Sequence, residues 1–327
     1  MDSYQRSLVV QFFSQCPRNT QAKCHQYIRR DLIPQLVPGH DTSVHVTPNL
    51  YQGSFSYTCI AGLHSSTSGR KDVVVQFRHE KQDLWGTTEA HHLHGVMAPL
   101  VSFQGSHEGL FIYTSQFSAG IPYTGLLASS EVSLTFNHRF QTIGDLADAL
   151  TRKAQGPSDH SCFNASLFSI DLMVNRFEFR NTDLRRQIKA SISRIQEQDH
   201  LLAKLPLVLT HMDMTPFNYL VDSASGKLTA ILDWDGAQYL PLGHNLHFVE
   251  HLFGYMTRDG WEDVEDREAL ESFFYDRFRR SMLLQGFDEK TLEALEHEKT
   301  LGILMYYVPK LFEWKDGIAE RYLERFM

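Results

Sequence analysis

Four polar side chains with the chemistry of a phosphoryl-transfer site lie between residues 207 and 237, in the stretch LVLTHMDMTPFNYLVDSASGKLTAILDWDGA. Phosphoryl transfer needs a carboxylate that orients the attacking hydroxyl, and oxygen ligands that hold Mg²⁺ against the phosphates. We expect Asp213 to be the catalytic base, and Asn218 and Asp233 to bind Mg²⁺. His211 belongs to the same catalytic loop, where we expect it to brace the chain rather than to react.

The spacing of these residues separates this interpretation from a simpler one. Asp and Asn often occupy caps and turns without any chemistry. Here an Asp is followed by four residues and an Asn, and a further Asp comes after the next apolar runs. The catalytic loop of protein kinases has the same gap and a later metal-binding Asp. The pattern therefore favours a working site.

The elements that must hold these side chains are short strands. "LVLTH" is an apolar run that ends in polar residues, and "YLVD" and "LTAILDW" are two further runs joined by the turn "SASGK". This pattern predicts a hairpin, with Asp233 at the end of its second strand. The other three candidates then lie at the ends of a loop over residues 211–218.

The periodicity of the chain changes near residue 118. Before it, a helical segment over 1–40 precedes apolar or alternating runs, a short helix and a hairpin about "GSHEG" (43–63, 71–80, 87–100 and 101–117). Beyond it, helical patterns dominate (142–156, 182–205, 267–286 and 289–314), the first with Thr142 and Asp145 as its capped start. We therefore expect an α+β fold with a strand-rich N-lobe over 1–117 and a mainly helical C-lobe over 118–327.

The overall composition is that of an ordinary soluble protein of 327 residues, with 42% apolar residues, 21% charged residues and a net charge of −8. This charge and the lack of a basic run argue against nucleic acid as a partner. We expect no membrane partner and a cytoplasmic location, because the sequence has neither a signal-peptide pattern nor an apolar run near the ~20 residues of a spanning helix. The four scattered cysteines are expected to be free thiols (Cys16, Cys24, Cys59 and Cys162).

A family resemblance adds to this interpretation. The run "THMDMTPFNYLVD…GKLTAILDWDGAQYLPLG" resembles the aminoglycoside phosphotransferase and choline kinase superfamily, and looks most like its fungal branch. The following "LPLGHNLHFVEHLFG" (240–254) is similar to a stretch of that branch. The resemblance implies a protein-kinase-like two-lobe fold, an ATP or GTP donor, Mg²⁺, and transfer of the γ-phosphoryl group to a hydroxyl of a small molecule. It also implies that Asp213 is the base.

The resemblance is weaker in the N-lobe, where it implies five nucleotide-binding residues. Gly53 and Ser54, in "YQGSFSYT", stand where a loop over the phosphates is expected. Glu89 matches the glutamate that orients a basic residue of the third strand. That strand, "VVVQFR", has the uncharged Gln76 where the family has Lys or Arg. Arg78 lies on the same strand face, and either it replaces the missing charge or nucleotide binding is weakened.

The Gln at this position leaves two other functions open. The chain is either a phosphotransferase, or a kinase-like fold that acts as a non-catalytic binding or regulatory protein, or an enzyme with different chemistry in the nucleotide cleft. Retention of the base and both metal ligands favours transfer. A small acceptor is favoured over a protein, because "GAQYLPLG" returns quickly to helix after "DWD".

Several other polar or aromatic groups have simpler interpretations. The histidines of "EAHHLHG" and "GHNLH" are expected to be solvated or packed rather than metal-bound, because no carboxylate or Cys completes a set near them. The acidic run over 259–271 is expected to be a solvated helix start, with a rival in which Asp263, Glu265 or Asp266 binds a cationic substrate. The C-terminal aromatics are expected to be core residues (Tyr306, Tyr307, Phe312 and Trp314).

Overall fold

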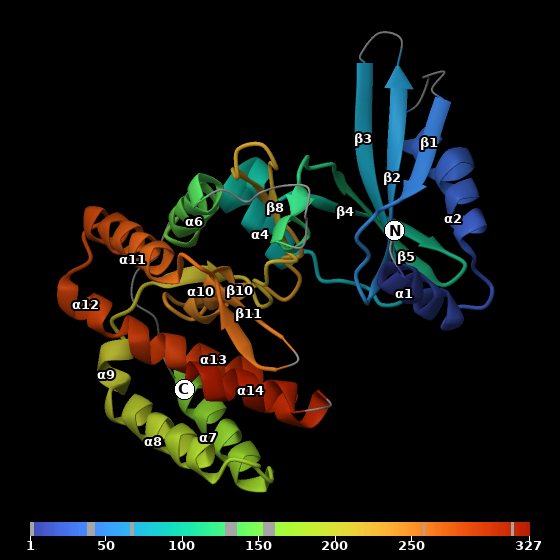
Figure 1. Cartoon of the computed structure of the whole chain (residues 1–327). Helices are drawn as coiled ribbons and strands as arrows, with labels where there is room; N and C mark the ends of the chain where they lie inside the picture. The colour runs from blue at the N-terminus through green and yellow to red at the C-terminus, as the bar shows by residue number, and fades with distance from the viewer. Residues whose placement is uncertain are drawn as a thin grey trace. The chain divides into compact units, whose positions relative to one another are not determined.

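The computed structural model describes residues 3–37, 43–65, 69–127, 136–152, 161–257, 259–314 and 317–327. The chain forms two compact units, Met1–Ala119 and Gly120–Met327, and each is described by itself (Figure 1). The first unit is a sheet with helices, and the second is mostly helical with three small sheets. The predicted α+β, protein-kinase-like class with a strand-rich first part and a helical second part is confirmed.

The first unit is built on a five-stranded antiparallel sheet in the order β1-β2-β3-β5-β4. Its strands are β1 (Ser43–Pro48), β2 (Ser56–Ser65), β3 (Gly69–Arg78), β4 (Val101–His107) and β5 (Leu110–Gln116). The predicted hairpin about "GSHEG" is confirmed as β4–β5, with Glu108 and Gly109 at its turn and φ of 47° and 84°. Positive φ at both central residues is what a tight two-residue hairpin turn requires.

The leading helices of the first unit pack on one face of this sheet, and two further helical elements follow β3. They are α1 (Ser3–Ser14), α2 (Gln21–Tyr27), the π-helical η1 (Ile28–Leu32), α3 (Ile33–Leu36), α4 (Trp85–His94) and the 3₁₀ turn η2 (Gly95–Met97). The alternation in β3 buries Val75 and Phe77 in a core with residues of the leading helices. Gln76 and Arg78 therefore lie on the opposite strand face, as their spacing predicts.

The second unit contains three small antiparallel sheets: β6-β8-β9, β10-β7 and β11-β12. Their strands are β6 (Ile121–Pro122), β7 (Leu207–Thr210), β8 (Tyr219–Val221), β9 (Leu228–Ile231), β10 (Gln238–Pro241), β11 (Gly254–Met256) and β12 (Trp261–Asp263). The hairpin predicted from "YLVD" and "LTAILDW" is confirmed as β8–β9. Strand β10 was not predicted, and it pairs with β7 before the chain returns to helix.

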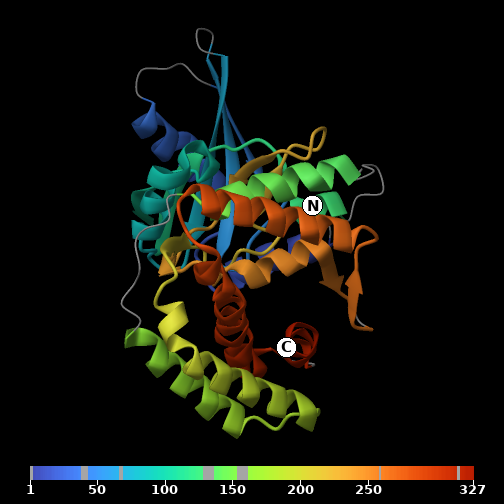
Figure 2. The same cartoon turned by 90° about the vertical axis from the view of Figure 1, so that its left-hand side faces the viewer.

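Ten helices of the second unit surround these sheets within the described part of the chain. They are α5 (Tyr123–Leu127), α6 (Phe136–Leu150), α7 (Ser161–Arg176), α8 (Thr182–Glu197), α9 (Asp199–Leu202), α10 (Leu246–Phe253), α11 (Arg267–Leu284), α12 (Glu289–Glu293), α13 (Leu295–Glu313) and α14 (Ile318–Phe326). Helices α6 and α11 run side by side (Figure 2), joined by Arg277, whose Nη2 lies 2.6 Å from Oδ2 of Asp148. Helix α7 was not predicted.

The predicted start of the helix over 142–156, which corresponds to α6, is wrong. The described part of α6 already begins at Phe136, so Thr142 and Asp145 lie inside the helix. The Thr142 hydroxyl donates to the Gly226 carbonyl at 2.6 Å, and Oδ2 of Asp145 accepts from the Leu228 amide at 3.0 Å. These side chains bind the β8–β9 hairpin instead of capping α6, and they help to fix the position of that hairpin.

Two further sequence expectations are wrong near the C-terminal helices. Residues 259–271 do not start one helix, because β12 intervenes and α11 begins at Arg267. Tyr307 is buried, but the side chains of Phe312 and Trp314 are 55% and 36% exposed and do not belong to the core. These residues lie at the end of α13 and beyond it, where the helix face turns to solvent.

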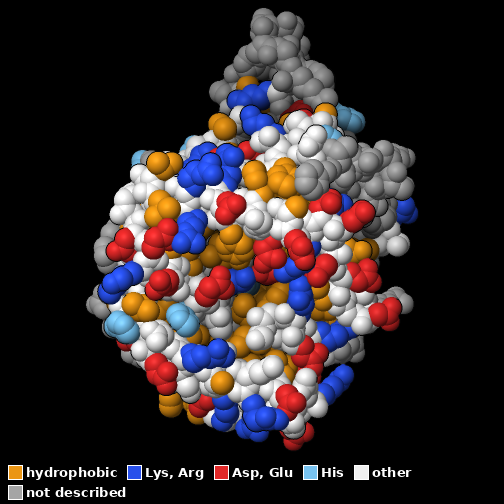
Figure 3. Space-filling model, turned by 60° about the vertical axis from the view of Figure 1, so that its left-hand side comes forward, with side chains coloured by type: hydrophobic (Ala, Val, Ile, Leu, Met, Phe, Trp, Pro, Cys, Tyr) orange, Lys and Arg blue, Asp and Glu red, His pale blue; other side chains and the backbone are white. Residues whose placement is uncertain are grey.

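The surface charge and the helices of the described residues concern the nucleic-acid and membrane partners that the sequence argues against. On the face drawn in Figure 3, basic and acidic side chains are interspersed, without the continuous basic field that nucleic-acid backbones favour. None of the described helices has the length and apolar character needed to cross a membrane. Cys16, Cys24 and Cys59 are free thiols, and the side chain of Cys162 lies outside the described residues.

Candidate active site

The loop from Asp213 to Asn218 closes on its own backbone. It follows β7, whose pairing with β10 fixes its start. The Asp213 carbonyl accepts hydrogen bonds from the Thr215 amide at 2.9 Å and from Nδ2 of Asn218 at 2.7 Å. The Asn218 amide in turn donates to the Thr215 carbonyl at 2.9 Å. These bonds bring the two predicted residues at the ends of the loop together.

His211 is fully buried, and both ring nitrogens are engaged by backbone groups. Its Nε2 donates to the Leu232 carbonyl at 2.7 Å, and its Nδ1 accepts from the Asp213 amide at 3.1 Å. Burial lowers the pKa of His211, so the ring is neutral near pH 7. A ring with both nitrogens engaged in this way suits the bracing role expected for it, rather than proton transfer.

The peptide group of Leu232 connects the catalytic loop to the second metal-ligand candidate. Its amide donates to the Asn218 carbonyl at 2.8 Å, and its carbonyl accepts from His211. Asp233 follows immediately, with its side chain exposed and a φ of 61°. Such a conformation is uncommon outside glycine, although Asp adopts it more readily than most residues. It costs about 1–3 kcal/mol, and residues held in it cluster at functional sites.

Asn218 and Asp233 offer the oxygen chemistry that Mg²⁺ prefers. Because Nδ2 of Asn218 donates to the loop backbone, its Oδ1 is the atom left for a cation. Among the described residues, no group of three or more His, Cys, Asp or Glu side chains could hold a metal ion. Mg²⁺ does not need such a group, because it usually binds one or two carboxylates together with water and substrate phosphates. The donor set therefore fits Mg²⁺.

The structure adds Tyr306, which the sequence interpretation placed in the core. Tyr306 lies on α13, and its hydroxyl donates to Oδ1 of Asp213 at 3.0 Å. Burial, and next the charge of Asp213, raise the pKa of Tyr306, so the phenol keeps its proton. No local sequence signal links two residues that are 93 positions apart.

The predicted nucleotide-binding residues all lie in the first unit. Gly53 and Ser54 are exposed between β1 and β2, next to the buried Gln52. The Gln52 side chain donates to the Asn49 and Thr58 carbonyls, both at 2.8 Å, and accepts from the Thr58 amide at 2.9 Å. This side chain ties the predicted phosphate loop to β2 and to the residue that follows β1.

Gln76, Arg78 and Glu89, the other three predicted nucleotide-binding residues, are half-buried in the first unit. Gln76 pairs with Thr58 of β2 across the sheet, and Arg78 pairs with Ser56. Glu89 lies on α4. Their assignment to the nucleotide stays a prediction.

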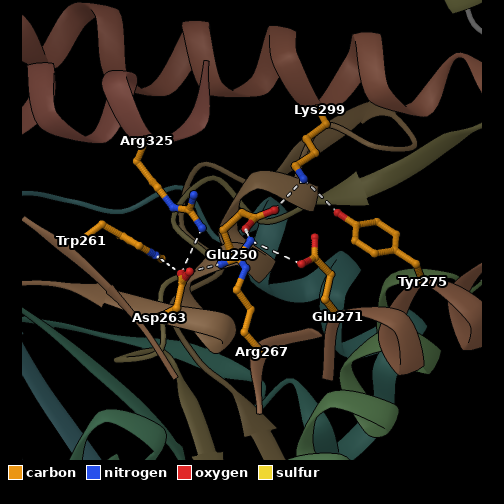
Figure 4. Close-up of polar contacts among 8 residues, drawn as sticks. All are labelled: Glu250, Trp261, Asp263, Arg267, Glu271, Tyr275, Lys299 and Arg325. Carbon is orange, nitrogen blue, oxygen red and sulfur yellow. Dashed lines mark hydrogen bonds and ion pairs between the residues drawn. The ribbon is translucent and has the colours of Figure 1, made fainter. Parts of the chain in front are cut away.

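A second group of charged side chains lies around Asp263, one of the residues of the rival cationic-substrate site. Oδ1 of Asp263 accepts from Nη1 of Arg267 and Nη2 of Arg325, each at 3.0 Å (Figure 4). Glu250 accepts from Arg267 at 2.9 Å and from Lys299 at 2.6 Å. Two guanidinium groups thus supply counter-charges to Asp263, and the rival interpretation, in which Asp263, Glu265 or Asp266 binds a cationic substrate, stays a prediction.

The histidines of "EAHHLHG" and "GHNLH" are buried or half-buried, except for His92, which is exposed. Nδ1 of His91 bonds to the Ala98 carbonyl at 2.8 Å. His244 and His247 are buried, and Nδ1 of His244 lies 2.9 Å from Oε1 of Glu298. That these histidines do not bind metal stays a prediction.

Comparison with solved structures identifies the fold. An aminoglycoside 2'-phosphotransferase in its GDP complex matches with a TM-score of 0.59 and 14% identity, over 94% of this chain and 98% of that chain. An ethanolamine kinase from Plasmodium vivax matches with 0.55 and 10%, over 94% and 88%. An aminoglycoside phosphotransferase in complex with GDP and kanamycin matches with 0.52 and 14%, over 92% and 96%. No curated protein sequence matches the chain.

A family model gives the assignment. The model described as "Phosphotransferase enzyme family" matches residues 90–281, more than half of the chain, and this range includes the whole loop described above. The resemblance to aminoglycoside phosphotransferases and choline kinases is thereby confirmed, and membership of the fungal branch stays a prediction. The chain belongs to the phosphotransferase enzyme family.

Proposed function

We propose that this phosphotransferase moves the γ-phosphoryl group of ATP or GTP to a hydroxyl group of a small acceptor, and that it requires Mg²⁺. Asp213 orients the acceptor hydroxyl, and Asn218 and Asp233 hold the metal ion. His211 braces the loop. Gly53, Ser54, Gln76, Arg78 and Glu89 contribute to the nucleotide site.

One observation carries the proposal. The Leu232 peptide is bound on one side by Asn218 and on the other by His211, and it is followed by Asp233 in a left-handed conformation. A turn between two strands does not require a buried histidine or a strained aspartate. Phosphoryl transfer depends on fixed positions of a carboxylate and metal ligands, because its catalysis is mainly positioning and charge stabilisation.

The donor and the acceptor are supported by the similar structures. Two of the similar structures are GDP complexes, which supports GTP as the donor, whereas ATP rests on the family resemblance alone. The similar proteins act on aminoglycosides and ethanolamine by their names, which supports a small acceptor. In this chain β10 begins at Gln238, shortly after Asp233, so a long segment for docking a protein substrate does not follow the metal ligand.

Gln76 favours a second function, a kinase-like binding protein without transfer. The uncharged side chain cannot neutralise phosphate charge, and the nucleotide site then depends on Arg78. This alternative leaves the strain at Asp233 unexplained. It predicts that the protein binds no Mg²⁺–nucleotide.

The melting temperature with ATP or GTP, with and without Mg²⁺, tests the proposal. A nucleotide at 100 times its Kd should stabilise the protein by about 2.7 kcal/mol, which raises the melting temperature by several degrees. Asp233→Asn should abolish the Mg²⁺-dependent part of this rise, since Asn also tolerates a positive φ and keeps the fold. No rise with either nucleotide in the wild type would contradict the proposal.

Asp222→Asn is the matched control. Asp222 caps the turn of the same hairpin through its Oδ1, which accepts from the Ala224 amide at 3.1 Å and the Ser225 amide at 2.8 Å. Asn can make the same turn, so this variant removes one charge without touching the metal ligands. The Mg²⁺-dependent rise in melting temperature of Asp222→Asn with nucleotide should equal that of the wild type.

A further inference from the structure

The hydrogen bond from Tyr306 divides the two oxygens of Asp213 between two tasks. Oδ1 accepts from the phenol at 3.0 Å. Oδ2 lies 3.5 Å from Nδ2 of Asn218, which is too long for a strong bond, and that nitrogen already donates to the Asp213 carbonyl at 2.7 Å. Oδ2 is thus the oxygen available to a hydroxyl group of a substrate.

Tyr306 can impose this division because its ring is held in place. The ring packs edge-on against Phe248, with centroids 4.8 Å apart, and against His247 at 5.5 Å. Both partners belong to α10, which follows closely after the site in the sequence. The ammonium group of Lys310 covers the ring at 4.0 Å from its centroid. The phenol ring is therefore packed between α10 and the Lys310 side chain of its own helix.

Helix α13, which carries Tyr306, packs closely against the segment before α10 at a point one turn before Tyr306. At Gly302 a Cβ atom would lie 2.2 Å from the His244 carbonyl, so α13 approaches this segment as closely as only glycine allows. One turn before that, Glu298 is fully buried and its Oε1 lies 2.9 Å from Nδ1 of His244. These two contacts fix where α13 packs against the segment around His244, and this packing fixes the position of the Tyr306 hydroxyl.

We infer that Tyr306 is a positioning residue of the transfer reaction, which holds Oδ1 of Asp213 so that Oδ2 faces the acceptor hydroxyl. The inference rests on the proposed role of Asp213 as the base. Asp213 is exposed, and an exposed carboxylate without this bond samples several side-chain conformations. A base held in one of them is in place whenever an acceptor binds.

Two tyrosines that are neighbours in sequence allow a matched test. Tyr306→Phe removes the hydroxyl that binds Asp213. Tyr307→Phe removes a hydroxyl that instead lies 2.9 Å from Nε2 of His251, so it reports the cost of losing one buried bond of α13. Mg²⁺-dependent nucleotide consumption is measured with water and with a panel of small alcohols as acceptors.

Tyr306→Phe should lower kcat by about 10- to 100-fold and leave KM for the nucleotide within about twofold, because orientation and not binding is lost. Tyr307→Phe should leave both within about twofold. In an Asp213→Ala background Tyr306→Phe should have no further effect, because the tyrosine acts through the carboxylate. An unchanged kcat in Tyr306→Phe, or an equal loss in both single variants, would overturn the inference.

Crystal structures of the wild type and Tyr306→Phe give a readout that does not require turnover. The Asp213 carboxylate should occupy one conformation in the wild type and more than one in the variant. The same single conformation in both proteins would overturn the positioning role, even if transfer occurs. A wild type that binds no Mg²⁺–nucleotide would instead contradict the proposed function, so the two failures are distinguishable.

Discussion

Replacement of His211 by Ala tests how the catalytic loop is held. The variant leaves the Leu232 carbonyl without its 2.7 Å donor and the Asp213 amide without its 3.1 Å acceptor. Each buried polar group left unpaired costs about 1–3 kcal/mol. The lost ring also opens a cavity beside Trp234, whose ring centroid lies 4.8 Å away. We expect a loss of about 4 kcal/mol in the free energy of unfolding of the second unit.

Urea unfolding followed by tryptophan fluorescence measures this loss. Trp234 contacts the ring that is removed and contributes to this signal together with Trp85, Trp261 and Trp314. His200→Ala is the control, because His200 is exposed on α9 and should cost no more than about 0.5 kcal/mol. A loss below about 1 kcal/mol in His211→Ala would refute the view that the ring holds the loop.

Three other predictions follow from buried contacts. Burial lowers the pKa of His251 to about 4, so the folded ring stays neutral at pH 5 while the unfolded ring, with a pKa of 6.5, is protonated; stability present above pH 6.5 is lost as the pH falls toward 4. Between pH 7.5 and pH 5, the free energy of unfolding of His251→Gln, measured in urea, should therefore fall by about 2 kcal/mol less than that of the wild type. An equal fall in both proteins would contradict the lowered pKa. Gln52→Ala removes three hydrogen bonds and should destabilise the first unit by about 2–3 kcal/mol, with faster exchange of the Thr58 amide hydrogen; unchanged exchange would show that this side chain does not hold the loop. Gly302→Ala forces a Cβ atom against the His244 carbonyl and should cost about 3 kcal/mol in thermal unfolding, and an unchanged melting temperature would show that α13 can move away.

Features set by nearby residues could be predicted from the sequence. The β4–β5 hairpin follows from "GSHEG" between two apolar runs, because Gly109 readily adopts the positive φ that a tight turn requires. Glu108, at the other central position, is not among the residues that such a turn favours. The spacing within residues 211–218 likewise places two polar groups at the ends of one loop, and the loop closes through bonds between those groups. In both cases the contacts that decide the structure lie within a few residues.

Features set by distant contacts could not be predicted. Tyr306 looks like one more core aromatic, and only the docking of α13 brings its hydroxyl to Asp213. Thr142 and Asp145 look like a helix cap, but their hydrogen bonds go to the β8–β9 hairpin about 80 residues later. Polar side chains have several possible partners, and tertiary packing selects among them.

Phosphorus NMR of the wild type with Mg²⁺, ATP or GTP, and a panel of small alcohols tests the central claim most directly. We predict that the γ-phosphate signal of one nucleotide is replaced by that of a phosphate monoester. Asp213→Asn should slow this conversion by about 10² to 10⁴, since Asn keeps the bond from Tyr306 but cannot accept the acceptor proton. Binding of Mg²⁺–nucleotide without any monoester, or an equal rate in the variant, would contradict the account.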